Sequence, residues 1–443
     1  MSPADVCKIN MTEVNAVNGR ISPSVPEQNK HKGNVLVYAT TAYMIDRFNM
    51  MNISMLQKMG YTVDAACNFE FGNPMSKESV EGFRARLRSI GVDAVQLPLT
   101  RNIFDIMHNG RALISTIRLM RERKYAFVHC HTPVGAVIAR LACRLTGTKV
   151  IYTAHGFHFF KGAPFKNRLV YYPVEKLMSY MTDVLITINK EDYETARKHF
   201  GMKKLEYVPG IGIDLARYTA SDDTDAIRDR ESLRAELGIN DETVLILSVG
   251  ELSRRKNHIT VLRALAEIER KRAKGSQELT GMHDYCYCIA GTGIYKDQLE
   301  RFAADNGISD KLKLLGYRED TDRLYRAADA FLFPSYQEGL SAALMEAMVC
   351  RLPAAVSRIR GNTDLVDDDG GILFDVGKEM KADKVNASAV RETENAVIRL
   401  LKLSHAERRA MGEHNYEKIR DGFSTEAVGS CLSRIYNEAG EDK

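Results

Sequence analysis

The sequence lacks any long apolar segment. No run of about 18 or more consecutive apolar residues occurs among its 443 residues, and a membrane-spanning helix needs about that length. We therefore expect no transmembrane span. Residues 1–33 are polar and aperiodic and lack the apolar core of a signal peptide, so we expect a disordered lead there.

Paired cysteine motifs are also missing. None of the eight cysteines belongs to a CxxC pair, which argues against a zinc ribbon. Most of them lie inside apolar runs, and Cys286 and Cys288 have the spacing that places both side chains on one face of a strand. This pattern indicates thiols packed in a core in a reducing cytoplasm.

The net charge is small but unevenly distributed. The chain as a whole has a formal charge of +4, whereas residues 34–214 carry 24 Lys and Arg against 15 Asp and Glu. A basic first half suggests an anionic surface or substrate as its partner. Ordinary solvated faces would explain the same charge equally well.

Short apolar runs rich in β-branched residues alternate with helical stretches, for example a helix between Ile45 and Met59 that ends at Gly60. Strands are predicted at residues 35–38, 63–66, 127–130, 150–153, 184–187, 244–249, 285–290, 312–315, 330–333 and 354–356. Such apolar strands between helices are typical of covered parallel sheets.

The break in this pattern predicts two domains. Residues 209–242 are rich in Gly, Asp and mixed charges without a strand candidate, so we interpret them as a linker. The sequence thus predicts an α/β protein with two Rossmann-like doubly wound domains, at 34–214 and 215–424. Ligands of such sheets bind at the carboxyl ends of the strands, so the expected site is a cleft between the domains.

Residues 331–349 are the most informative segment. A strand ends at Pro334, a loop follows, and a helix begins near Ser341, which is a good N-cap residue. The free amides at such a helix start favour a bound anion. Glu338 lies in the loop and Glu346 lies in the helix; from spacing alone they are either a clamp for sugar hydroxyls or ordinary surface carboxylates.

The segment P-S-x-x-E-G-L-S-x-x-x-x-E-A-M resembles the E-x7-E motif of family 4 retaining glycosyltransferases, which have the GT-B fold. Residues 248–258, 290–293 and 315–318 resemble the phosphate-binding turn and nucleotide-lining loops of that family. Other segments resemble its bacterial exopolysaccharide and capsule branch, namely residues 153–159, 188–193 and 360–365. The resemblance spans residues 35–425, approximately. It also implies that a C-terminal helix, which begins at Thr425 and lies within residues 425–443, crosses back onto the first domain.

The resemblance implies a role for each matched position. Glu346 would bind the ribose, Glu338 would hold hydroxyls of the donor sugar, and Lys256 would neutralise the leaving diphosphate. His155 would face the donor sugar from the first domain. Further substrate-binding positions are Gly250, Gly316, Tyr317, Arg318, Gly339, Leu340 and Ser341.

One position departs from the family pattern. Many members have an arginine that pairs with phosphate where this chain has Glu251. Arg254 or Arg255 could substitute for it, and we take Arg255 as the candidate. The first domain also lacks a glycine-rich loop after its opening strand, and the candidates for holding the acceptor are Asp46, Arg47 and Asn68.

The activity implied by the resemblance is metal-independent, retaining transfer of a hexose or N-acetylhexosamine from a nucleotide-diphosphate sugar, with UDP as the expected nucleotide. The implied acceptor is a lipid-linked saccharide at the inner face of the cell membrane. An anionic membrane surface is therefore an expected partner, while no cofactor and no nucleic acid are expected.

Two rival functions remain open. A UDP-sugar epimerase shares this architecture but would need additional acid and base residues in the cleft. A non-enzymatic nucleotide-sugar sensor would keep Glu346 and could dispense with Glu338 and Lys256, both of which are present.

Metal sites are also conceivable. The histidines at strand ends lack a regularly spaced carboxylate or thiol partner set, so we expect no zinc there; they are His129, His131, His155 and His158. Residues 320–322 and 367–369 contain D-x-D, a metal motif of a different glycosyltransferase fold. We interpret both as helix starts or turns.

Overall fold

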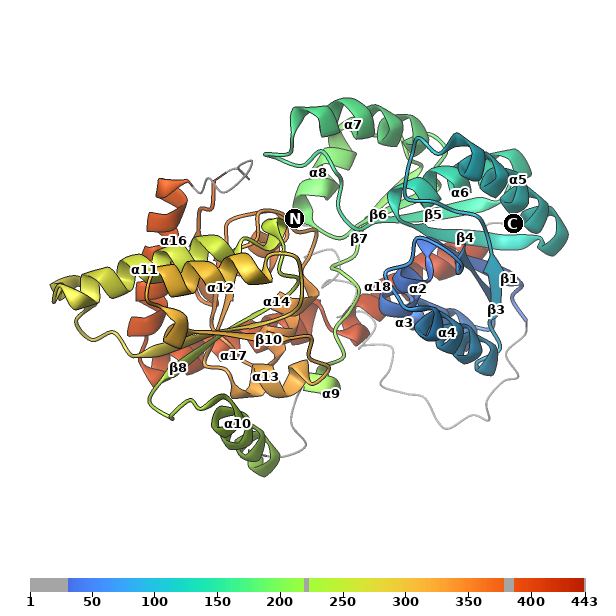
Figure 1. The fold of residues 1–443 in the computed structure, drawn as a ribbon. Coiled ribbons are helices and arrows are strands. Elements are labelled where there is room, and N and C mark those ends of the chain that lie inside the picture. Colours follow the sequence, from blue (N-terminus) through green and yellow to red (C-terminus); the bar gives the residue numbers. More distant parts are fainter. Residues whose placement is uncertain (1–30, 219–222, 378–385, 442–443) are drawn as a thin grey trace. The chain divides into compact units, whose positions relative to one another are not determined.

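The computed structural model describes residues 31–218, 223–377 and 386–441. The described chain forms two compact units, residues 31–212 with 425–441 and residues 213–424 (Figure 1). The division falls two residues before the expected one, at 212/213, and the second crossing is at 424/425. Most of the expected disordered lead lies outside the described residues.

The first unit is built on seven parallel strands in the order β3-β2-β1-β4-β5-β6-β7. Their bounds are β1 Asn34–Thr41, β2 Thr62–Asn68, β3 Asp93–Gln96, β4 Tyr125–His131, β5 Lys149–Ala154, β6 Val184–Thr187 and β7 Lys204–Tyr207. The two edge strands, β3 and β7, are not among the predicted ones. Both carry charged residues and are half-exposed, so they lack the apolar run that identifies a buried strand.

Helices cover both faces of this sheet. One face carries α2 Ala42–Phe48, α3 Met50–Lys58, α4 Lys77–Ser89 and α18 Thr425–Glu441, and the other carries α5 Ile106–Arg123, α6 Pro133–Thr146, α7 Phe165–Ser179 and α8 Lys190–His199. The single helix predicted between Ile45 and Met59 is wrong, because Asn49 separates α2 from α3. Its side-chain amide donates to the Met44 carbonyl at 2.9 Å, which interrupts the helix.

The C-terminal helix α18 belongs to the first unit, beside α3 (Figure 1). Its Tyr436 ring stacks on Phe127 of β4 with ring centroids 5.7 Å apart. Val428 and Ile435 of the same helix are buried in the core beneath the sheet. The last helix therefore completes a core that begins about 400 residues earlier in the chain.

The second unit contains six parallel strands in the order β10-β9-β8-β11-β12-β13. They are β8 Val244–Val249, β9 Tyr285–Ala290, β10 Leu312–Gly316, β11 Ala330–Phe333, β12 Ala354–Ser357 and β13 Gly371–Phe374. Only β13 was not predicted. Cys286 and Cys288 lie on one face of β9, as expected, and both are buried free thiols.

Helices flank this second sheet on both faces. One face carries α10 Asp223–Leu237, α13 Thr321–Ala327, α14 Ala342–Val349 and α17 His405–Gly422, and the other carries α11 His258–Ala273, α12 Lys296–Asp305 and α16 Ala387–Lys402. Shorter helical pieces are α9 Leu215–Tyr218, α15 Asn362–Leu365, η1 Arg254–Lys256, η2 Gln277–Leu279 and η3 Ser309–Lys311. Both sheets confirm the predicted fold class of two Rossmann-like domains.

The linker predicted for residues 209–242 is wrong over much of its length, because α10 lies within it. Arg230 and Arg234 of this helix bind the two carboxylate oxygens of Asp329 at 2.7 and 3.1 Å. Leu233 between them is fully buried. The helix is therefore held largely by ion pairs, which a search for apolar periodicity does not detect. No helix in the described parts of the chain is long and apolar enough to cross a membrane.

Candidate functional site

The loop after β8 brings Lys256 to the carboxyl end of the second sheet. Gly250 has a φ of +156°, and a Cβ at this position would lie 3.1 Å from Cε of Lys256. The Lys256 side chain therefore packs against the backbone of Gly250, where a larger residue would have its Cβ. Asn257 follows in the left-handed conformation and donates from its side-chain amide to the Pro334 carbonyl at 3.0 Å, which joins this loop to the end of β11.

The loops after β8, β9 and β10 are joined through their backbones. The Gly250 amide donates to the Ala290 carbonyl at 2.9 Å, and the Gly291 amide donates to the Gly316 carbonyl at 2.7 Å. A Cβ on Gly291 or Gly293 would overlap backbone atoms of residues 250–252. Gly291 and Gly293 are therefore needed for the close packing of these loops.

Glu338 is held between two cations. Its Oε1 lies 2.8 Å from Nη1 of Arg255 and 2.8 Å from Nζ of Lys256. The Lys256 and Glu338 side chains are only 10% and 11% exposed, whereas Arg255 is 42% exposed. The Lys256 ammonium also lies 4.4 Å from the centroid of the Phe333 ring. Burial lowers the pKa of Lys256, and the Glu338 carboxylate opposes that shift.

One of the two candidate arginines, Arg255, has several contacts with the loop that carries Glu338. Arg255 Nη1 also donates to the Gln337 carbonyl at 3.1 Å, and the Arg255 carbonyl accepts from the Tyr336 amide at 2.9 Å. Arg255 is therefore attached to the loop that carries Glu338 at both its backbone and its side chain. Arg255 therefore supplies a positive charge to this loop, whereas the acidic Glu251 at the position of the family's arginine cannot.

The helix start predicted at Ser341 is confirmed. Ser341 is the N-cap of α14, and its hydroxyl accepts from the Leu344 amide at 3.4 Å. The first amides of a helix have no partner within it, so those of α14 can bind an anion. Gly339 and Leu340 precede the cap, and Leu340 packs against the apolar core of the unit.

Two residues that the sequence did not single out for the site hold this loop in place. Nε of Arg360 donates to the Glu338 carbonyl at 3.1 Å, and the guanidinium is buried. Gly361 has a φ of +81°, and a Cβ there would overlap the Gly339 carbonyl oxygen. The only sequence signal for them was the family likeness of residues 360–365.

Glu346 lies about one turn into α14 and is half-buried. The hydroxyl of the buried Tyr325 donates to its Oε2 at 2.9 Å. Burial, and then the Glu346 charge, raise the pKa of Tyr325 and that of the neighbouring Tyr218. Both tyrosines thus remain protonated and able to donate to the carboxylate. Neither has a sequence signal as a site residue.

The loop after β10 contains the three residues expected to seat the nucleotide base. Gly316 adopts a φ of +67°, and the side chain of Tyr317 is exposed. The Arg318 guanidinium binds Asp320 through two 2.7 Å hydrogen bonds and Glu236 through a third. The Arg318 side chain is therefore already engaged by carboxylates, which leaves the loop backbone and Tyr317 as the accessible groups.

In the first unit His155 follows β5 and belongs to a group of three histidines. We call His129, His131 and His155 the histidine cluster. His131 Nδ1 lies 3.1 Å from His155 Nε2. His129 is hydrogen-bonded to Tyr436 and Thr153, both at 2.8 Å. Burial lowers the pKa of His129 to about 3 and that of His155 to about 4, and lowers that of His131 as well. All three rings are therefore neutral at pH 7.

The candidates for acceptor binding have different environments. Asn68 is fully buried, and its side chain accepts from the amides of Glu70 and Phe71, which makes it a turn-forming residue. Asp46 forms ion pairs with Arg86 and Arg47. Of these candidates, only Arg47 has a largely exposed side chain.

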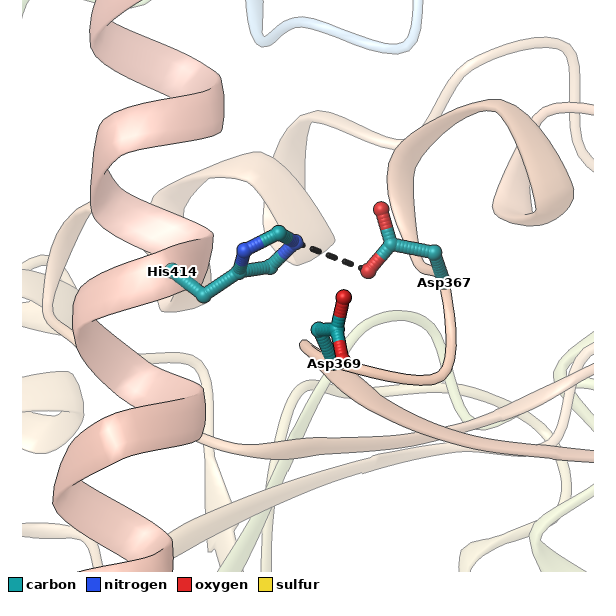
Figure 2. A group of neighbouring side chains, drawn as sticks. All are labelled: Asp367, Asp369 and His414. Atoms are coloured by element: carbon teal, nitrogen blue, oxygen red, sulfur yellow. Dashed lines mark hydrogen bonds and ion pairs between the residues drawn. The ribbon is translucent and has the colours of Figure 1, made fainter.

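The D-x-D runs are a helix start and a turn, as interpreted. Asp320 is the N-cap of α13. Among the described residues, one group of three acidic or histidine side chains lies close enough together to share a metal ion, namely Asp367, Asp369 and His414 (Figure 2). Asp367, however, already binds His414 at 2.8 Å and Lys418 at 2.7 Å. Together these two partners explain the cluster as a link between the turn and α17.

Two family models match the chain. The model described as "Glycosyl transferase 4-like" matches residues 36–189, and "Glycosyl transferases group 1" matches residues 229–415. The first match lies in the first unit and the second match lies in the second unit.

Relatives of known sequence span most of the chain. A putative glycosyltransferase EpsD of Bacillus subtilis (strain 168) is 32% identical over 351 residues, which are 77% of this chain and 84% of that protein. The UDP-Gal:alpha-D-GlcNAc-diphosphoundecaprenol alpha-1,3-galactosyltransferase of Escherichia coli is 29% identical over 74% of this chain and 78% of its own length. The crystal structure of Anabaena Alr3699/HepE in complex with UDP and glucose is similar in fold, with a TM-score of 0.68 and 16% sequence identity. The similarity covers 91% of this chain and 99% of that one.

Proposed function

Because this chain belongs to the family 4 glycosyltransferases, which have the GT-B fold, we propose that it transfers a sugar from a nucleotide diphosphate to a lipid-linked saccharide. The sugar would be a hexose or an N-acetylhexosamine, and the nucleotide would be UDP. The product would serve exopolysaccharide or capsule synthesis. The name of the E. coli relative supports this pair of substrates, since it states a UDP-linked donor and a diphosphoundecaprenol acceptor.

The observation that carries the proposal is the pairing of Glu338 with Lys256 and Arg255 beside the first turn of α14. A diphosphate bound at this helix start would meet both cations and the free amides, which together would stabilise the charge that develops as it leaves. It would share the cations with Glu338. The carboxylate would then accept hydrogen bonds from hydroxyls of the donor sugar.

The remaining residues would orient the donor. Glu346, positioned by Tyr325, would accept from the ribose hydroxyls, and the loop that contains Tyr317 would seat the base. His155, neutral at pH 7, would hydrogen-bond the donor sugar. Fixing the donor in a reactive geometry lowers the barrier without a covalent step.

The transfer would proceed with retention by front-face attack. The bond between the acceptor oxygen and the anomeric carbon forms as the bond from that carbon to the diphosphate breaks, and the acceptor proton passes to the leaving diphosphate. No side chain acts as a nucleophile. We propose that no metal is needed, because Lys256, Arg255 and the helix amides supply the positive charge. Full activity in EDTA is the expected result, and loss of activity restored by Mg²⁺ or Mn²⁺ would contradict this part of the proposal.

The test of function is transfer from radiolabelled UDP-sugars to polyprenyl-diphosphate-linked saccharides. Glu338→Gln and Lys256→Met should each lower kcat by about 100-fold or more, as the loss of one electrostatic contact to a transition state does. Glu300→Gln, on the exposed face of α12, is the matched control and should leave the rate unchanged. Undiminished transfer by the Glu338→Gln protein would overturn the assignment.

The same preparation separates the rival functions. With UDP-GlcNAc and no acceptor, an epimerase converts the sugar, whereas a transferase leaves it intact or hydrolyses it slowly. A sensor binds the nucleotide-sugar without turnover under either condition. We place the reaction in the cytoplasm, with the protein bound peripherally at the inner face of the cell membrane, where a lipid-linked acceptor would be available.

A further inference from the structure

Exposed apolar side chains concentrate on one side of the first unit. Of the fifteen large hydrophobic residues that are exposed in the described part of the chain, ten lie on or beside α5, α6 and α7. Five of the ten belong to α7 and its C-cap, namely Phe165, Leu169, Val174, Leu177 and Tyr180. These helices cover the same face of the sheet, and α6 contacts both α5 and α7 (Figure 1). An apolar concentration of this kind marks a binding surface.

Helix α7 buries its acidic residue and exposes several apolar side chains. Its only acidic residue, Glu175, is buried and binds Arg140 at 3.0 Å and the Tyr152 hydroxyl at 3.1 Å. Its outer side carries Phe165 and Leu169, which are 78% and 68% exposed. A helix on the surface of a soluble protein normally buries its apolar stripe and exposes its charges. The outer stripe of α7 therefore calls for an apolar environment outside the protein.

The exposed charges of residues 161–180, which contain α7, are all basic. Residues 161–180 include four cationic side chains, Lys161, Lys166, Arg168 and Lys176, and all four are exposed. Because the acid in this segment is buried, its exposed charge is entirely positive. The exposed positions of α5 add three basic residues, Arg111, Arg118 and Arg121, against one acid, Glu122. A second copy of the same face would be repelled by like charges, whereas anionic phosphate groups above an apolar layer would complement it.

We propose that the exposed side chains of α5, α6 and α7, here called the basic-apolar face, bind an anionic lipid surface. Helix α7 lies in the interface with Phe165, Leu169 and Leu177 among the acyl chains, since their spacing by multiples of four places them on one side of the helix. Its basic side chains reach the headgroup phosphates. The inference rests on the proposed function in one respect, because that function gives the reason for the protein to be at a membrane.

The absence of tryptophan from the chain provides a direct test. The Phe165→Trp variant of the full chain carries a single tryptophan whose fluorescence reports its environment. With vesicles of phosphatidylglycerol and phosphatidylcholine we expect a blue shift and quenching by brominated acyl chains. With vesicles of phosphatidylcholine alone we expect neither. The matched control is Ile90→Trp at the end of α4, on the opposite face of the same sheet, which should show no change.

Flotation with the same vesicles separates the contribution of the basic side chains from that of the apolar side chains. Lys166→Gln with Lys176→Gln should weaken binding about 25-fold at low salt, at about fivefold for each lost charge, and should reduce its dependence on salt. Leu169→Gln with Leu177→Gln should weaken binding at every salt concentration. Arg88→Gln with Ile90→Gln, on α4, should do neither.

Three results would overturn the proposal. The first is vesicle binding without any spectral change in the Phe165→Trp protein, which would place the contact elsewhere. The second is equal insertion into neutral vesicles. The third is a tryptophan already shielded without lipid, which would mean that another segment or a second copy covers this face. Neither donor nor acceptor is present in these measurements, so a failure here is distinct from a failure of the proposed transfer activity.

Discussion

Replacing Glu338 with glutamine removes the carboxylate that Arg255 and Lys256 share, with both nitrogens 2.8 Å from the same oxygen. Glutamine has nearly the same shape, so the loop should keep its path. The electrostatic consequence falls mainly on Lys256, whose side chain is 10% exposed and would be left beside another cation. Burial already lowers the pKa of this lysine, and the loss of Glu338 would lower it further.

The expected size of the effect follows from the burial of the pair. Removing one partner of a buried ion pair costs about 3–5 kcal/mol, and the partly exposed Arg255 favours the lower end, about 3 kcal/mol. Lys256→Met leaves Glu338 paired with Arg255 and should cost about 1.5 kcal/mol, which includes the lost contact with the Phe333 ring. The double variant leaves no unpaired buried lysine. We therefore expect about 2.5 kcal/mol for it, and a coupling energy of about 2 kcal/mol.

The assay is urea unfolding of the four proteins, followed by circular dichroism. The pH dependence gives a second readout. Because the folded Glu338→Gln protein holds Lys256 with a lowered pKa, its unfolded state binds more protons in the window up to about pH 10. Its deficit in stability should therefore shrink as the pH rises through that window. Added UDP should stabilise this variant more than the wild type, because the diphosphate restores a counter-charge.

A Glu338→Gln protein as stable as the wild type would refute this reasoning. Additive effects in the double variant would refute it as well, because the two side chains would then not be coupled. Equal stabilisation of both proteins by UDP would place the diphosphate away from Lys256.

Three further predictions concern other parts of the structure. Tyr325→Phe removes the hydroxyl that donates to Glu346, so we expect a loss of about 1 kcal/mol in stability and a higher KM for the donor with little change in kcat; an unchanged KM would separate Glu346 from donor binding. Gly361→Ala places a Cβ against the Gly339 carbonyl at a positive φ, and we expect a loss of more than about 1 kcal/mol in thermal unfolding together with impaired transfer. The control is Gly110→Ala in α5, where the added Cβ meets no atom within 4 Å. The three rings of the histidine cluster have lowered pKa values, so between pH 6.5 and 5 the unfolded state binds more protons than the folded state. The free energy of unfolding should therefore fall by up to about 1.4 kcal/mol per pH unit for each ring, and a constant melting temperature over that range would contradict their neutrality.

The amino-acid sequence by itself determined the local features of this protein. Each of the ten predicted strands lies within an observed strand, because a strand buried on both faces must be apolar along its whole length. The start of α14 at Ser341 follows from the capping preference of serine. The spacing of Glu338 and Glu346 was sufficient, together with the neighbouring motifs, to indicate the family.

The tertiary structure decided which distant groups meet. Edge strands and α10 escaped prediction because charges and ion pairs hold them, and an ion pair between Arg234 and Asp329 has no periodic signature. Arg255 contacts a loop about 80 residues away, and the local sequence does not indicate this partner. The pairing of Tyr325 with Glu346 likewise joins different helices.

The orientation of α7 is the clearest case. Its sequence contains both an apolar stripe and charges, and periodicity alone would place the apolar side inward. Only the fold shows that Arg140 holds Glu175 inside, which turns Phe165 and Leu169 outward. The two partners of this buried ion pair are 35 residues apart in the sequence, and the local sequence of α7 does not indicate such a partner.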